Sequence, residues 1–315
     1  MATRLSEFKR LFGFGEQKDT STWNARRLDT ILRKAEDAIW DAVTGDSEGD
    51  VGKVLEDLMQ KLPGAYMQNR WGALARKETY AQNIPGVNFP KFLEGYQEYL
   101  GKLVNLCRPL TQEEIERVEG LEEDMDEGEY SILFIAICRG WHKDVEYLLR
   151  RPEIALGIQC GSHRRTTLFE AVRRESDALV SKILECPFVS PSQHIDIGDA
   201  DENTPLHQVA LNMGSDERKP STENSNVKSF NALLLHGANI DAFNNQFRTP
   251  LHILANYRPP SKEAAKCAKE LLEAGAEVNP KDENGRSLVH FLSTESNLAN
   301  RFVEFGRGIA VTCCL

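Results

Sequence analysis

Apolar residues recur along much of the chain at intervals of three and four positions, and short words of sequence return together with them. TPLHQVA begins at Thr204, TPLHILA at Thr249 and SLVHFL at Ser287. Two more divergent copies, SILFIAICRGWHKDVEYLL and TTLFEAVRRESDALVSKIL, begin at Ser131 and Thr166. Intervals of three and four place apolar side chains along one face of a helix. The pattern therefore predicts a series of similar helix pairs.

The distance between the copies indicates the kind of repeat. Successive copies begin 35, 38, 45 and 38 residues apart, and the polar stretches MGSDERKPSTEN and YRPPSK fit loop insertions into a unit of about 33 residues. With the echoes LLLHGANI and LLEAGAEV, residues 126–306 resemble the ankyrin-repeat family. The resemblance implies units of a turn, a short helix and a longer antiparallel helix, each buried against its neighbours. We predict an all-α ankyrin-repeat solenoid of about five helix-turn-helix units, preceded by an N-terminal helical region.

Each of the three clearest copies has a histidine three residues after a threonine or serine. The Thr249 hydroxyl is expected to cap a helix, and Pro250 suits the first helical position because no backbone donor is needed there. His252 is then placed to return a hydrogen bond to the cap, and the ankyrin resemblance implies that it also reaches the backbone of the adjoining repeat. We assign this structural role to Thr204, His207, Thr249, His252, Ser287 and His290.

A metal or catalytic site built on these histidines is disfavoured. One histidine per repeat places the three rings in separate layers of a stack, and no spacing of Asp, Glu or Cys brings them together. The sequence has no Ser/His/Asp order, Gly-rich phosphate loop or H-x-x-x-H element. We predict no metal, no cofactor and no enzymatic activity.

The first 125 residues are less regular. Apolar stripes predict helices near 28–43 and 89–104, and IWDAVTGDSEGDVGKVLEDLM (39–59) has the outline of a degenerate ankyrin unit. TQEE at 111–114 fits a capping box that opens an acidic helix. The predicted parts are a flexible N-terminal segment at 1–20, a helical domain at 21–110, an acidic helix or linker at 111–129, ankyrin repeats at 130–306 and an apolar C-terminal segment at 307–315. The segment 1–20 has an alternative role as an amphipathic segment that binds a partner or a membrane surface.

Charge and composition narrow the class of partner. The net charge is −10, and residues 113–129 carry ten acidic side chains against one basic residue, Arg117. Charge of this sign repels phosphate backbones, so nucleic-acid binding is disfavoured. The seven cysteines are scattered without a C-x-x-C, and no apolar run is long enough to predict a membrane span. We expect a protein partner and a cytoplasmic or nuclear location, and the oligomeric state stays open.

Candidate binding residues lie in the turns, because ankyrin arrays present their turns and inner helices as a concave face. Phe247 stands where the family has glycine, so its turn is either remodelled or strained. Aromatic residues and arginine are typical of binding hot spots, and an arginine pair suits an acidic peptide. The predicted partner-binding residues are His163, Arg164, Arg165, Phe243, Phe247, Arg248, Lys281, Glu283 and Arg286. The alternative for each is an ordinary solvated turn.

A narrower resemblance concerns the last repeats. SFNALLLHGANIDAFNNQFRTPLHILANYRPPSKEAAKCAKELLEAGAEV, with its long insertions, is similar to the C-terminal ankyrin pair of the Fem (feminization) proteins. That resemblance implies a substrate receptor of a cullin-RING ubiquitin ligase, in which VTCCL is all that corresponds to the family's adaptor-binding helix. We predict a non-enzymatic scaffold that binds a protein through ankyrin turns and inner helices, with the ligase receptor, or a relic of one, as the alternative.

Overall fold

A computed structural model of the chain describes residues 25–45, 47–61, 101–111, 114–115, 128–214, 223–256, 262–288 and 290. The chain divides into two compact units, Met1–Ala155 and Leu156–Leu315. The sequence predicts a boundary at 111–129 instead, and most of that acidic stretch lies outside the described residues. The segments predicted at 1–20 and 307–315 and most of both loop insertions lie outside them as well. Among the described residues, no helix has the length and apolar character needed to cross a membrane.

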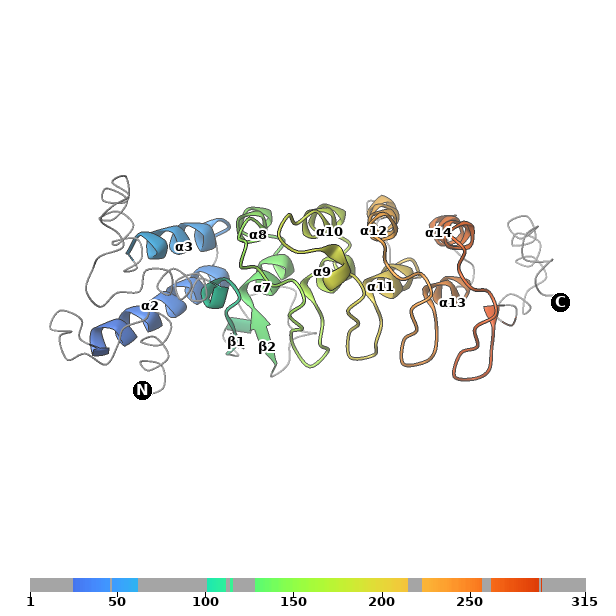
Figure 1. The fold of residues 1–315 in the computed structure, drawn as a ribbon, viewed down its shortest axis with the longest axis horizontal. Coiled ribbons are helices and arrows are strands. Elements are labelled where there is room, and N and C mark those ends of the chain that lie inside the picture. The colour runs from blue at the N-terminus through green and yellow to red at the C-terminus, as the bar shows by residue number, and fades with distance from the viewer. Residues whose placement is uncertain are drawn as a thin grey trace, which may run out of the picture. The chain divides into compact units, whose positions relative to one another are not determined.

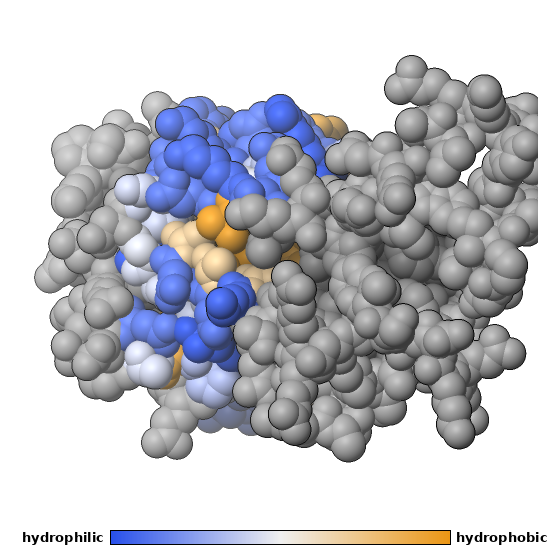
Figure 2. Space-filling model, turned by 90° about the vertical axis from the view of Figure 1, so that its left-hand side faces the viewer, coloured by the Kyte–Doolittle hydropathy of each residue, from blue (hydrophilic) through white to orange (hydrophobic). Residues whose placement is uncertain are grey.

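The first unit is built from two helix pairs and a small sheet. Its elements are α2 (Ala25–Thr44), α3 (Asp50–Lys61), β1 (Cys107–Pro109), β2 (Glu129–Ser131), α7 (Ile132–Cys138) and α8 (His142–Leu149). The two strands are antiparallel, with Arg108 opposite Tyr130. Helix α2 contacts α3 and α7, and α3 contacts α8. Viewed from the α2 and α3 side, Figure 2 shows hydrophobic residues gathered between hydrophilic ones, as expected for amphipathic helices that pack side by side.

Polar contacts join the two pairs of the first unit. The buried carboxylate of Asp144, in the first turn of α8, accepts hydrogen bonds from Gly49 N at 2.7 Å and Gly52 N at 3.3 Å. These amides lie at the start of α3, where backbone donors have no partner within the helix. The degenerate unit predicted at 39–59 falls on α2 and α3, and this pair contacts α7 and α8 as one repeat contacts the next. Helix α2, at 20 residues, is longer than an ankyrin inner helix.

The second unit is a stack of helix pairs. Its elements are α9 (Thr167–Arg173), α10 (Asp177–Leu184), the 3₁₀ turn η1 (Pro191–Gln193), α11 (Pro205–Asn212), α12 (Glu223–Leu235), α13 (Pro250–Ala255) and α14 (Lys262–Glu273). In Figure 1, α9, α11 and α13 form one layer and α10, α12 and α14 form a second. The loops that enter α9, α11 and α13 project from one side of this stack.

The buried side chains of the second unit follow the repeat period. Leu168, Leu206 and Leu251 occupy the same place in successive copies, and each is at most 1% exposed. Burying a leucine fully stabilises a fold by roughly 1.5 to 3 kcal/mol. Each of these side chains lies on a face shared with a neighbouring pair, so the layers stabilise one another. The predicted all-α helical-repeat fold is confirmed.

Candidate protein-binding groove

Three hairpins of the second unit, at 199–203, 244–248 and 282–286, share one backbone design. In the middle hairpin, Asn244 N donates to Arg248 O at 3.0 Å. The Asn244 side-chain oxygen accepts from Gln246 N and Arg248 N, both at 3.0 Å. Asp199 and Asp282 form the corresponding bonds in the outer hairpins. An Asp or Asn side chain that accepts from backbone two residues ahead stabilises a tight turn.

Each hairpin is also bonded to the next. Asn245 N donates to Asp201 O and Glu283 N donates to Gln246 O, both at 3.0 Å. These bonds fix the spacing of the hairpins along the stack. The side chains at the tips therefore stand in a regular row rather than on independent loops.

The fourth residue of each hairpin adopts a left-handed backbone. Its φ angle is 60° at Glu202, 55° at Phe247 and 72° at Gly285, and Arg164 has 52° in the preceding turn. Glycine adopts this conformation without penalty, whereas a residue with a Cβ in a sparsely populated region costs of order 1 to 3 kcal/mol. Of the two outcomes that the sequence allows for Phe247, the structure shows the strained one, because the hairpin bonds are the same as at Gly285.

The histidines of α11 and α13 connect a helix start to the loop of the next repeat. His252 Nδ1 accepts from Thr249 N at 3.2 Å, and its Nε2 lies 3.1 Å from Pro280 O. His207 has the same arrangement, with Nδ1 3.1 Å from Thr204 N and Nε2 2.9 Å from Arg248 O. A ring that accepts at Nδ1 carries its proton at Nε2, so each histidine is a neutral donor to a carbonyl.

Burial governs the protonation of these rings. Burial lowers the pKa of His207 to about 4, and burial also lowers the pKa of His252. At neutral pH both rings are uncharged and both of their nitrogens are engaged. His290 is exposed and forms the first half of the arrangement, with Nδ1 3.1 Å from Ser287 N. Within the part of the chain that the structure describes, no group of His, Cys, Asp and Glu is arranged to hold a metal ion.

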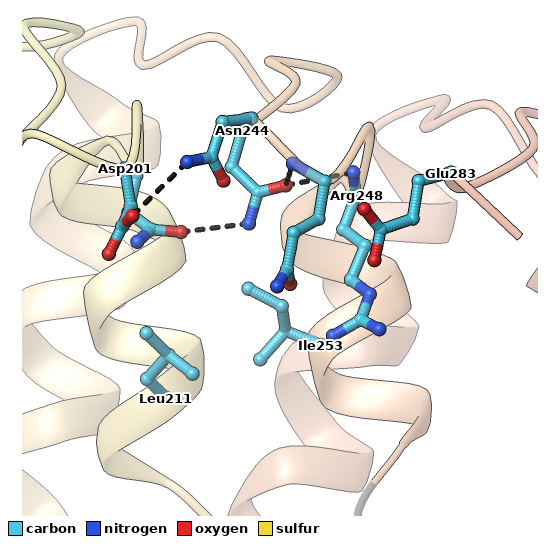
Figure 3. Close-up of a pocket in the computed structure, with 9 residues that line it drawn as sticks. Asp201, Leu211, Asn244, Arg248, Ile253 and Glu283 are labelled. Atoms are coloured by element: carbon cyan, nitrogen blue, oxygen red, sulfur yellow. Dashed lines mark hydrogen bonds between the residues drawn. The ribbon is translucent and has the colours of Figure 1, made fainter.

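A groove of about 370 Å³ opens between the hairpins and the inner helices of the second unit. Leu211 of α11 and Ile253 of α13 form its apolar floor, below the polar side chains of the hairpins (Figure 3). Leu211 is 39% exposed, which is unusual for a leucine in an inner helix, and Ile253 is 7% exposed. The lining residues are Asp201, Asn203, Leu211, Asn244, Asn245, Gln246, Arg248, Ile253 and Glu283.

Hydrogen bonds between side chains hold the groove walls in place. Asn244 Nδ2 donates to Asn203 Oδ1 at 2.9 Å, and Asn245 Nδ2 donates to Asp201 Oδ1 at 3.1 Å, as Figure 3 shows. On the other side, Arg248 Nε lies 3.7 Å from the buried carboxylate of Asp282. The groove is thus a preorganised surface, with each hairpin braced against its neighbour.

A second arginine partner explains why the buried Asp282 is ionised. Burial alone opposes the charged form, but two hydrogen bonds from Arg286, at 2.8 and 3.0 Å, lower the pKa of Asp282 below its usual range. Arg286 therefore serves the hairpin itself, and Arg248 is held beside the same carboxylate.

The predicted binding residues fall in different places. Arg248 and Glu283 line the groove. Phe243 and Phe247 lie outside its lining but are 47% and 60% exposed on the middle hairpin. Lys281 is exposed on the loop that enters the last repeat.

The earlier turn at 160–165 does not reach the groove lining. Its Arg164 donates to Gln159 at 3.0 Å. The Arg165 guanidinium lies 3.8 Å from the buried carboxylate of Glu170, which also pairs with Arg173 and Arg174. His163 contributes its backbone, because its carbonyl accepts from Ala200 N at 2.8 Å. These contacts give the turn a bonding role within the second unit.

Several groove residues are absent from the sequence-based prediction, namely Asp201, Asn203, Leu211, Asn244, Asn245, Gln246 and Ile253. One signal was present at Leu211. TPLHQVAL has leucine where the next copy, TPLHILAN, has Asn256. An apolar residue at a position that is polar in the neighbouring copy indicates an exposed contact rather than a core position.

Comparison with known proteins agrees with this geometry. The Ankyrin repeat family matches residues 246–283, which include α13, α14 and most of the loop that follows. Inversin from Canis lupus familiaris is 25% identical over 174 residues, which is 55% of this chain and 14% of Inversin. The chain thus covers only a small part of that relative. Residues 246–283 thus match an ankyrin repeat, and the helix pairs stacked with them, joined by bonded hairpins of one design, have the helical-repeat architecture that such repeats build.

Proposed function

We propose that this protein is a non-enzymatic scaffold that binds a protein partner in the groove between its hairpins and inner helices. Ankyrin repeats are typical of protein–protein interaction modules. The observation that carries the proposal is the groove itself, with Leu211 39% exposed on its floor. An apolar floor inside a polar rim is the usual anatomy of a protein-binding site.

Phe247 supports the same surface. Its side chain is 60% exposed, so it contributes little to the core, although its backbone is strained with φ at 55°. Strained residues cluster at functional sites, and exposed aromatics often anchor partners. A role in binding gives a reason for a phenylalanine at a position where glycine removes the strain.

The test replaces Phe247 by glycine in the full chain. The substitution removes both the aromatic contact and the backbone strain, so we expect a more stable protein that captures its partners less well. Partners are compared by quantitative proximity labelling with the wild-type chain, and stability is measured by thermal unfolding. Phe188→Ala is the matched control, because Phe188 is 49% exposed but belongs neither to the groove lining nor to one of the three hairpins.

The readout is the difference between the variants rather than the capture of any one protein. Partners that disappear with Phe247→Gly and Leu211→Ser but persist with Phe188→Ala support the proposal. An unchanged set of partners in both groove variants contradicts it, provided that both proteins are folded.

A cytoplasmic or nuclear location is part of the proposal. Among the described residues, no disulfide joins the cysteines Cys107, Cys138, Cys160, Cys186 and Cys267, which supports a reducing compartment.

A ligase-receptor role is the second candidate, and it rests on the resemblance of the last repeats to the Fem proteins. Most of the insertions MGSDERKPSTEN and YRPPSK, at 215–222 and 257–261, and the terminal VTCCL lie outside the described residues. The same labelling experiment tests this role, because cullin and elongin subunits among the partners of the wild-type chain favour a receptor. Their absence alongside other groove-dependent partners excludes it.

A further inference from the structure

The charge of the groove indicates the kind of segment that it takes, an inference that rests on the proposed function. Its ionisable lining consists of Asp201, Glu283 and Arg248. Both carboxylates are exposed, whereas Arg248 is partly buried and faces the buried carboxylate of Asp282. Part of the arginine charge is therefore compensated inside the protein, and an incoming segment meets a negative rim.

No ion pair within the described residues neutralises the carboxylates of that rim. Asp201, Glu202 and Glu283 form no ion pair with the lysines and arginines whose placement is described. The Asp201 carboxylate accepts a hydrogen bond from the neutral Asn245 amide at 3.1 Å. Such a bond orients a carboxylate without neutralising it.

The surrounding sequence strengthens the negative potential. Residues 187–214 contain no lysine or arginine, and their carboxylates are Asp196, Asp199, Asp201 and Glu202. Charge repulsion therefore disfavours an acidic segment here and attracts a basic one, with an effect that reaches about 10 Å at 0.1 M salt.

The floor adds an apolar requirement. Leu211 and Ile253 lie below the hairpin side chains, between the hairpins that carry Asp201 and Glu283 (Figure 3). Covering Leu211 removes exposed apolar area from water, at roughly 25 cal/mol per Å². The exposed amides of Asn245 and Gln246 offer donors and acceptors to a peptide backbone.

We propose that the groove takes an extended segment of a partner protein in which a lysine or arginine stands beside an apolar residue. The basic side chain lies between Asp201 and Glu283. The apolar side chain covers Leu211 and Ile253. The bonded hairpins hold the backbones of Asp201 and Glu283 at a fixed spacing, so the segment is recognised without rearrangement of the backbone.

A peptide selection tests this inference directly. The probe is a phage library of random 12-residue peptides, selected on the immobilised full chain and counter-selected on the double variant Asp201→Asn, Glu283→Gln. We expect the enriched peptides to share a lysine or arginine next to a leucine, isoleucine, valine or aromatic residue. A synthetic copy should bind the double variant about tenfold more weakly than the wild type, and raising the salt from 50 to 300 mM should weaken its binding to the wild type.

The matched control removes the same charge elsewhere. Glu185→Gln with Glu277→Gln changes two exposed carboxylates that do not line the groove, and it should leave the affinity for the synthetic peptide within twofold. Equal weakening by the control pair shows that net charge alone is responsible and overturns the inference.

The remaining outcomes are also decisive. Enriched peptides that are acidic, or that lack a basic residue, overturn the inference. If Leu211→Ser abolishes the binding of those peptides, the groove is still a binding site. A library that yields no groove-dependent peptide overturns it too. Self-association that the groove variants abolish assigns the surface to a second copy of the chain. Failure of the proposed function has a different signature, because partner capture is then insensitive to Phe247→Gly and Leu211→Ser.

Discussion

Mild acid should destabilise this protein through buried neutral histidines. Burial lowers the pKa of His207 and of His194 to about 4. His194 follows η1, is 1% exposed, and neither of its ring nitrogens has a hydrogen-bond partner among the described residues. In the unfolded chain both rings return to a pKa near 6.5.

The sign follows from which state binds more protons. Between pH 6.5 and 4 the unfolded chain protonates these rings and the folded chain does not, so stability falls as the pH falls. Lowering the pH from 7.0 to 5.5 should cost about 1.2 kcal/mol per histidine, or about 2.5 kcal/mol for the two. Few carboxylates titrate above pH 5.5, so this window isolates the imidazoles.

The assay is urea unfolding followed by far-UV circular dichroism at pH 7.0, 6.25 and 5.5. His207→Gln keeps an acceptor for the helix cap but does not titrate, so it should lower stability at pH 7.0 and remove about 1.2 kcal/mol of the pH dependence. Gln in place of the exposed His142 controls for the substitution itself. A free energy of unfolding that is flat from pH 7.0 to 5.5 refutes the reasoning, as does a slope that His207→Gln leaves unchanged.

Two further substitutions probe the bonds that join repeats. His252→Ala should lower the free energy of unfolding by about 1 to 3 kcal/mol, because Thr249 N and Pro280 O lose a partner. Urea unfolding measures this free energy, and a change below about 0.5 kcal/mol contradicts the bonding role of His252. Asp144→Asn should destabilise the first unit by about 1 kcal/mol, because the two carboxylate oxygens accept separately from Gly49 N and Gly52 N and an amide keeps only one of these acceptors. Hydrogen exchange at the start of α3 should rise, and a substitution in the exposed pair Lys53 and Asp50 serves as the control.

The sequence predicted the repeat stack well because its determinants are local. The segment TPLHILA contains a capping residue, a proline and apolar positions, all of which act within two turns of helix. Helix α13 and its cap can therefore be predicted from this short segment alone. The same holds for α11. The helix pair at the start of the first unit was visible only as a weak outline, because its first helix is much longer than the family's.

The groove could not be predicted from the sequence, because its walls form only when successive repeats stack. Asn203 and Asn244 lie 41 residues apart, and nothing in either hairpin alone shows that their side chains bond. The backbone conformation of Phe247 could not be predicted for a related reason. A non-glycine residue argues for a changed turn, but the Asn244 side chain holds the hairpin closed at two backbone amides and maintains the strain.

Arg248 O belongs to two bonds at once. It closes the middle hairpin by accepting from Asn244 N at 3.0 Å, and it receives His207 Nε2 at 2.9 Å. This carbonyl therefore links the hairpin tip that carries Phe247 to the first turn of α11. If a ligand at the tip strengthens the bond between His207 and Arg248 O, thermodynamic reciprocity requires that protonation of His207, which weakens that bond, lowers the affinity for the ligand by the same factor.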